Sequence, residues 1–252
     1  MKTYNAFSIN RIGLLMYRHV FYNLKTYLLS FAALGSILII ISLLNTIGTN
    51  YLDKELFETL GKTFLFIGGV MLTSNIFKEI SSKHRGWLYM MLPANPSEKI
   101  LSYWLLTTVA YVVMASLTMV VSSIVLSVFS GLIFKTAFYV FNPFSIAYLN
   151  VMLHYCIIQS LFFFGAIFFQ KNNFIKTILS VFVFNTILGV IAVIIMFLLF
   201  GTAGMDSNNL KLTDDHFFSV TIPPYIAKIS YYGLMVPFFV IVSYFKFKER
   251  EV

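Results

Sequence analysis

Long apolar runs separated by short polar segments dominate the chain. Six runs stand out, near residues 27–47, 60–77, 100–129, 145–169, 174–201 and 226–245. A helix needs about 20 apolar residues, at a rise of about 1.5 Å each, to cross the hydrocarbon layer of a membrane. The run 177–200 carries no charged residue, and each Leu, Ile, Val or Phe favours insertion by about 0.3–0.6 kcal/mol. The pattern therefore predicts an all-α integral membrane protein with six transmembrane helices, forming one transmembrane domain over residues 1–252.

The segment before the first run has a second pattern. Arg11, Arg18 and Lys25 recur every seven residues, so that on a helix they form one stripe, with Met16 and Val20 on the far side. Such a helix lies in the membrane interface, with its apolar face toward the hydrocarbon and its cations toward lipid phosphates. We expect an interfacial amphipathic helix over residues 1–26. The alternative is a plain cytoplasmic tail whose charges only orient the protein.

Composition supports a membrane protein and narrows the chemistry. Of 252 residues, 59% are hydrophobic and only 11% are charged, whereas a soluble domain carries about 25% charged residues. The single cysteine, Cys156, excludes a disulfide within the chain. The net charge of +8 comes from residues that flank the apolar runs instead of forming one basic face. We therefore expect membrane lipid, and no nucleic acid, as a partner.

The distribution of Lys and Arg predicts the orientation. If the N-terminus is inside, thirteen of the 18 Lys and Arg residues, including every arginine, lie in cytoplasmic segments. An excess of these residues marks the cytoplasmic side of a membrane protein. With six spans, both the N-terminus and the C-terminus lie in the cytoplasm.

No motif in the chain predicts catalysis, a metal or a cofactor. Gly61-Lys62-Thr63 resembles the end of a phosphate-binding loop, but the first glycine of that motif is missing. His154 and Cys156 are two positions apart and point away from each other on a helix, which makes them a poor ligand pair. The apolar runs contain no Asp or Glu, which disfavours an intramembrane enzyme and weakens an ion-coupled carrier.

The polar stretch 78–99, between the second and third runs, is the candidate functional segment. Four apolar residues in it share one helical face, at spacings of seven, eight and eleven: Ile80, Trp87, Leu88 and Met91. Two cations, Lys83 and Arg85, fall outside this apolar set. The spacing predicts a short cytoplasmic amphipathic helix over residues 79–91. Whether its apolar face contacts lipid or protein is left open by the periodicity.

A helix start follows this segment directly. Asn95 is a good N-cap residue, Pro96 suits the first helical position, and Glu98 is placed to reach back to the cap. Asn95 and Glu98 are therefore predicted to cap the third transmembrane helix.

The layout resembles that of the type-2 ABC exporter permeases, which have six spans, an amphipathic N-terminal helix and a cytoplasmic helix between spans two and three. Residues 92–99, LPANPSEK, are also similar to an LPAS-x-x-EK pattern associated with such permeases in Bacteroidota, with Asn95 in place of Ser.

The resemblance implies that helix 79–91 is a coupling helix that docks on a separate ABC ATPase subunit, with Trp87 as its anchor. ATP hydrolysis would occur only in that partner, so this chain would need no cofactor and would not itself be an enzyme. The resemblance further implies the bacterial inner membrane and pairing with a second permease copy or a paralogue. The exported substrate stays open among lipids, hydrophobic peptides and drugs. The alternative function is a non-transporting membrane sensor or assembly scaffold.

Overall fold

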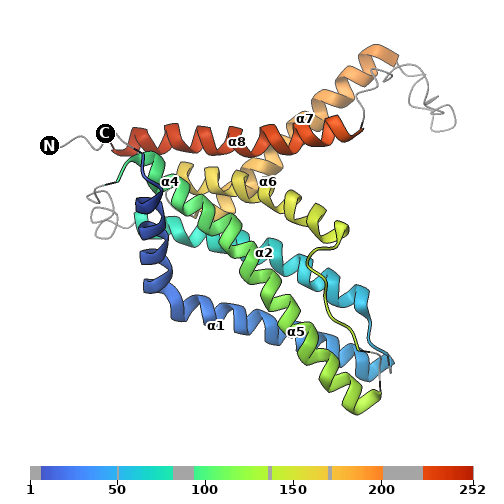
Figure 1. Ribbon diagram of the computed structural model, residues 1–252. Helices are drawn as coiled ribbons and strands as arrows, with labels where there is room; N and C mark the ends of the chain where they lie inside the picture. Colours follow the sequence, from blue (N-terminus) through green and yellow to red (C-terminus); the bar gives the residue numbers. More distant parts are fainter. Residues whose placement is uncertain are drawn as a thin grey trace.

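A computed structural model describes residues 7–49, 51–81, 94–135, 138–169, 172–200 and 224–251. This part of the chain is 90% helical and contains no strand. The helices, shown in Figure 1, are α1 (Ile9–Thr49), α2 (Lys54–Ser81), α4 (Pro96–Leu105), the π-helical turn η1 (Leu106–Ala110), α5 (Tyr111–Phe134), α6 (Ile146–Phe168), α7 (Asn173–Phe200) and α8 (Pro224–Glu251). The all-α class expected from the sequence is confirmed.

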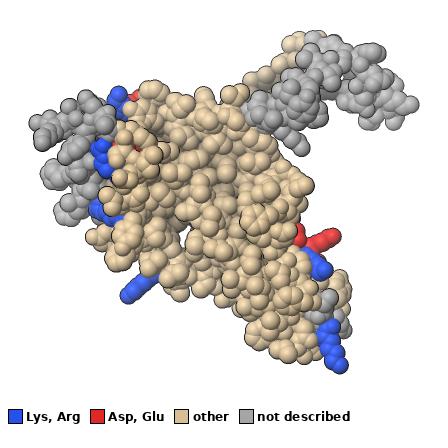
Figure 2. All heavy atoms as spheres, viewed as in Figure 1, with Lys and Arg blue, Asp and Glu red and all other residues tan. Residues whose placement is uncertain are grey.

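Five helical stretches in the described residues are long and apolar enough to cross a membrane. They are Ile9–Thr49, Lys54–Ser74, Pro96–Phe134, Ile146–Phe168 and Asn173–Ile195. The chain is therefore a multi-pass membrane protein. The sixth predicted run, 226–245, falls within α8 and stays a predicted span. Figure 2 shows Lys, Arg, Asp and Glu at two opposite ends of the molecule, separated by a broad band of other residues.

The N-terminal segment and the first span form one continuous helix, α1, and not two helices divided near residue 26. Figure 1 shows that α1 bends, so that its first part runs across the direction of the remaining helices. The helix continues because residues 9–49 contain no proline and only isolated glycines. The bend thus changes the helix direction without a loop.

Close contacts between aromatic side chains and α2 hold the centre of the bundle together. α2 packs against α6, which in turn packs against α8, while α1 packs against α5. Gly69 of α2 allows the ring of Tyr155 to approach, since a Cβ atom at Gly69 would lie only 2.2 Å from the Tyr155 hydroxyl. Tyr155 is fully buried there. A glycine is required at this crossing because any side chain would displace the ring.

α7 differs from the other helices in being exposed around most of its surface. None of its most apolar 18-residue window is buried. A helix that is apolar on every side is found in a protein core or in a membrane. The side chains from Phe182 onward, where described, are therefore placed to contact lipid or another chain.

Candidate functional site: the charged end of the bundle

The start of α1, the start of α4 and the end of α8 meet at one end of the molecule (Figure 1). One of the two groups of charged residues in Figure 2 lies at this end. Residues 82–93, which contain most of the predicted coupling helix, connect α2 to α4 directly before this meeting point. We call the contacts among the starts of α1 and α4 and the end of α8 the junction.

α4 begins with the predicted cap. Asn95 has extended backbone angles, Pro96 occupies the first turn, and the Asn95 backbone N–H donates to Glu98 Oε2 at 3.0 Å. A carboxylate in the first turn also interacts favourably with the positive end of the helix dipole. Local sequence alone accounts for this half of the Glu98 environment.

The second carboxylate oxygen of Glu98 binds the start of α1, which the sequence did not predict. Ser8 donates its backbone N–H to Glu98 Oε1 at 2.8 Å, across 90 positions of sequence. Arg11 Nη2 lies 3.5 Å from the same oxygen, and the Glu98 side chain is fully buried. Leaving one member of a buried ion pair without its partner costs about 3–5 kcal/mol. Glu98 therefore fastens α1 to α4.

This contact corrects the expectation for the cation stripe. Arg11 was expected to face lipid phosphates, but it faces Glu98, because the start of α4 lies against the first turn of α1. Arg18 and Lys25 are exposed, and the Arg18 guanidinium lies 5.9 Å from the centre of the Tyr22 ring. Two of the three cations thus remain available to lipid.

An apolar cluster supports the junction from inside the bundle. Its buried members come from α4, η1, α6 and α8: Ile100, Tyr103, Leu106, Phe163, Ala166, Ile167 and Phe247. Met16 and Val20 of α1 pack against this cluster. The face opposite the cation stripe therefore contacts protein and not hydrocarbon alone. Phe247, which is 1% exposed, brings the end of α8 into the same unit.

Of the predicted docking residues, only Ile80 belongs to the part of the chain that the structure describes. Ile80 lies in the last helical turn of α2, so the first residues of the predicted helix 79–91 continue α2. Lys83, Arg85, Trp87, Leu88 and Met91 lie outside the described residues.

A polar network in the middle of the bundle surrounds η1, a feature that no sequence pattern predicted. Thr107 and Thr108 of η1 contact Gln159 of α6: Thr108 Oγ1 donates to Gln159 Oε1 at 2.9 Å, and Gln159 Nε2 donates to Thr107 Oγ1. Tyr155 donates its hydroxyl to the Thr107 carbonyl at 2.8 Å.

Short π-helical turns occur frequently at functional sites and leave backbone groups that need other partners. The sequence contains only a weak indication of this polar network, namely two adjacent threonines in one apolar run and a glutamine in another. The network holds η1 against α6 and so links the segment leading from the junction to the rest of the bundle.

The described residues hold no cluster of three or more His, Cys, Asp or Glu side chains able to bind a metal. His154 hydrogen-bonds within the bundle, with Nδ1 2.8 Å from the Asn150 carbonyl and Nε2 2.9 Å from the Tyr232 hydroxyl. Asn185 donates its amide to the Val181 carbonyl of its own helix. Both exposed side chains thus have hydrogen-bond partners within the protein.

Comparisons of the chain with protein-family models, with curated proteins and with solved structures find no match.

Proposed function

We propose that this chain is the transmembrane permease subunit of an ATP-driven ABC exporter in a bacterial inner membrane. A separate ATPase subunit supplies ATP hydrolysis and docks on the cytoplasmic segment 79–91. A second copy of the chain or a paralogue completes the permease. The observation that carries the proposal is the junction. The segment that would bind the ATPase leads directly into α4, and the start of α4 is bound to the start of α1 through Glu98.

The proposed topology has six spans with both termini in the cytoplasm. It is supported by the start of α1 and the end of α8, which lie at the same end of the molecule in Figure 1, as an even number of crossings requires. The excess of Lys and Arg in segments assigned to that side agrees with the orientation.

The proposed coupling follows from the contacts of Glu98. A displacement of segment 82–93 would act first on Asn95, at the start of α4. Because Glu98 binds both the Asn95 N–H and the Ser8 N–H, the start of α1 would move with it. The displacement would then pass along α4 to η1, where Gln159 and Tyr155 connect it to α6. Each step is a contact between neighbouring elements.

Docking itself would depend on the apolar face of segment 79–91. Burial of a large apolar side chain in a protein groove contributes about 1.5–3 kcal/mol, whereas an exposed ion pair adds about 0–1 kcal/mol. Trp87 should therefore contribute more than Lys83 or Arg85. Large aromatic residues at the centre of an interface commonly dominate its affinity.

Co-purification tests the proposal. The chain would be expressed with the ATPase encoded beside it, extracted in mild detergent and recovered through a tag on the permease. The unchanged chain should retain the ATPase, Trp87→Ala should lose most of it, and Lys83→Ala should lose less. Equal recovery with all three chains would remove the docking claim, and no recovery with any of them would favour the sensor or scaffold alternative.

A further inference from the structure

The bend of α1 encloses a cavity of about 460 Å³ between α1, α2 and the start of α5. This volume lies within the range of about 300–1,000 Å³ that is typical of small-molecule sites. The cavity does not include Glu98 or the polar network at η1. Its lining comes from eight residues between positions 19 and 34 of α1, five between positions 64 and 72 of α2, and Tyr111.

One wall of the cavity is polar and comes entirely from the bend of α1. His19 Nε2 lies 2.8 Å from the Tyr27 hydroxyl, and Asn23 donates its amide to the His19 carbonyl at 3.1 Å. An Asn side chain has a second N–H and a carbonyl oxygen, and a Thr hydroxyl both donates and accepts. Asn23 and Thr26 therefore have hydrogen-bonding capacity to offer a polar group at this wall.

The remaining lining is mostly apolar; Ser30 donates its hydroxyl to the Thr26 carbonyl, and Tyr111 brings a second hydroxyl. Phe31 and Leu34 of α1 face Phe64, Ile67 and Met71 of α2 across the cavity. Ile67 is 52% exposed and Met71 is 54% exposed, so a chain of methylene groups would cover apolar surface that the protein leaves open. Within a membrane, an acyl chain held there gains van der Waals contacts with these side chains, because lipid tails are as apolar as the side chains themselves.

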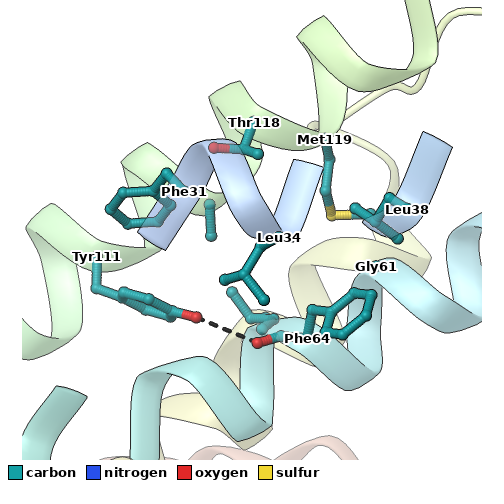
Figure 3. Close-up of a pocket in the computed structure, with 10 residues that line it drawn as sticks. Phe31, Leu34, Leu38, Gly61, Phe64, Tyr111, Thr118 and Met119 are labelled. Carbon is teal, nitrogen blue, oxygen red and sulfur yellow. Dashed lines mark hydrogen bonds between the residues drawn. The ribbon is translucent and has the colours of Figure 1, made fainter. Parts of the chain in front are cut away.

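Figure 3 shows the residues at the apolar end of the cavity. A smaller space of about 20 Å³ shares Phe31, Leu34, Phe64 and Tyr111 with the larger cavity and extends it toward Gly61 and Met119. The Tyr111 hydroxyl donates to the Phe64 carbonyl at 3.2 Å, so it presents no unsatisfied donor to this end. The Met119 side chain fills the space at Gly61, where a Cβ atom would lie 2.0 Å from Met119 Cε. The extension is therefore narrow and largely apolar.

The cavity thus has a polar wall at one end and an apolar end at the other. Two exposed cations are next to residues of the polar wall in the sequence. Arg18 and Lys25 flank the polar residues of the bend and are both exposed. A polar group bearing negative charge is attracted to such cations at a membrane surface, by about 1 kcal/mol for each Lys or Arg near anionic lipid.

We propose that this cavity is a binding site for an anionic membrane phospholipid, with one acyl chain in the apolar part and the phosphate at the bend of α1. A cavity of about 460 Å³ whose interior is largely apolar has room for an acyl chain of a lipid. The site requires no ATPase and is independent of the exporter proposal.

Photolabelling in lipid vesicles tests the site. The full chain would be reconstituted in phosphatidylcholine vesicles containing phosphatidylglycerol with a photoactivatable acyl chain, and the labelled peptides would be mapped by mass spectrometry. Label should concentrate on the α1 and α2 segments that contain Leu34, Ile67 and Met71. Unlabelled phosphatidylglycerol should compete at least about tenfold better than phosphatidylcholine, which corresponds to about 1.4 kcal/mol.

Matched variants distinguish the cavity from the general lipid surface. Ala33 and Ala32 are neighbouring exposed residues of α1, but only Ala33 lines the cavity. Ala33→Trp should reduce labelling of these segments about tenfold, and Ala32→Trp should leave it unchanged. Ile67→Trp blocks the cavity from α2 and provides a second test if Ala33→Trp fails to fold. Equal labelling in the blocking and control variants would overturn the proposal.

Competition experiments separate the possible ligands. Stronger competition by free palmitate than by phosphatidylglycerol would assign the cavity to a fatty acid and overturn the phospholipid proposal. Equal competition by phosphatidylcholine and phosphatidylglycerol would overturn the anionic headgroup. Arg18→Gln combined with Lys25→Gln should reduce the preference for phosphatidylglycerol while labelling remains in the same peptides.

Discussion

Removing the Glu98 carboxylate should loosen the junction more than any loss of a surface ion pair. Glu98→Ala leaves the Asn95 and Ser8 backbone N–H groups without their acceptor and the Arg11 guanidinium without the carboxylate 3.5 Å away. Breaking a buried ion pair costs about 3–5 kcal/mol. The Arg11 side chain is 23% exposed, so water partly compensates it and the lower end of that range applies, about 3 kcal/mol.

The single free cysteine provides the assay. Cys156 lies in α6, and its reaction with a thiol-specific fluorescent dye on heating reports unfolding in detergent. A change of 1 kcal/mol shifts Tm by about 2–4 °C for a chain of 150–250 residues, so Glu98→Ala should lower Tm by about 6–12 °C. Glu98→Gln keeps one acceptor oxygen but loses the charge. Its Tm should therefore lie between those of Glu98→Ala and the unchanged chain.

Glu249→Ala is the matched control. Glu249 pairs with Lys246 at 2.6 Å, but its side chain is 65% exposed. Exposed pairs contribute about 0–1 kcal/mol, so Tm should fall by no more than about 4 °C. Equal shifts for Glu98→Ala and Glu249→Ala would refute the reasoning that Glu98 fastens α1 to α4.

Three further changes probe the middle of the bundle and the segment after α5. Gly69→Leu should lower Tm clearly more than Gly48→Leu, because a Cβ atom at Gly69 meets Tyr155 whereas nothing lies within 4 Å of one at Gly48; equal Tm values would contradict the close packing. Gln159→Leu should speed amide hydrogen exchange across residues 106–111, since each buried hydrogen-bonding group left without a partner costs about 1–3 kcal/mol. Tyr139 lies in the segment after α5, and burial together with a hydrogen bond to a neighbouring carboxylate raises its pKa above 10.0. Its contribution to stability is therefore present below about pH 10 and declines as pH rises further. The Tm of Tyr139→Phe should fall less than that of the unchanged chain between about pH 10 and 12, and an equal fall would argue against this contact.

The sequence predicted those features of the fold that depend on residues close together in the chain, such as the length of a helix or its cap. Apolar length predicted the fourth and fifth runs to within a residue or two of α6 and α7. The pattern from Asn95 to Glu98 predicted a helix start, because a cap depends on residues three positions apart.

Contacts between distant segments were not predictable in this way. Nothing in the spacing of the N-terminal cations indicated that Arg11 meets Glu98, since that pairing depends on where α4 lies in the bundle. The same holds for η1, which is stabilised by Gln159 and Tyr155 from another helix. The bend of α1, and with it the cavity, also depends on tertiary packing that a periodic pattern does not encode.

The most direct test of the exporter proposal is ATP turnover by the partner ATPase in proteoliposomes, measured with and without this chain. We predict that the unchanged chain raises the rate above that of the ATPase alone, and that Trp87→Ala returns it to the basal value while still inserting in the membrane. The same rate with the unchanged chain, with Trp87→Ala and with no permease would contradict the proposed function.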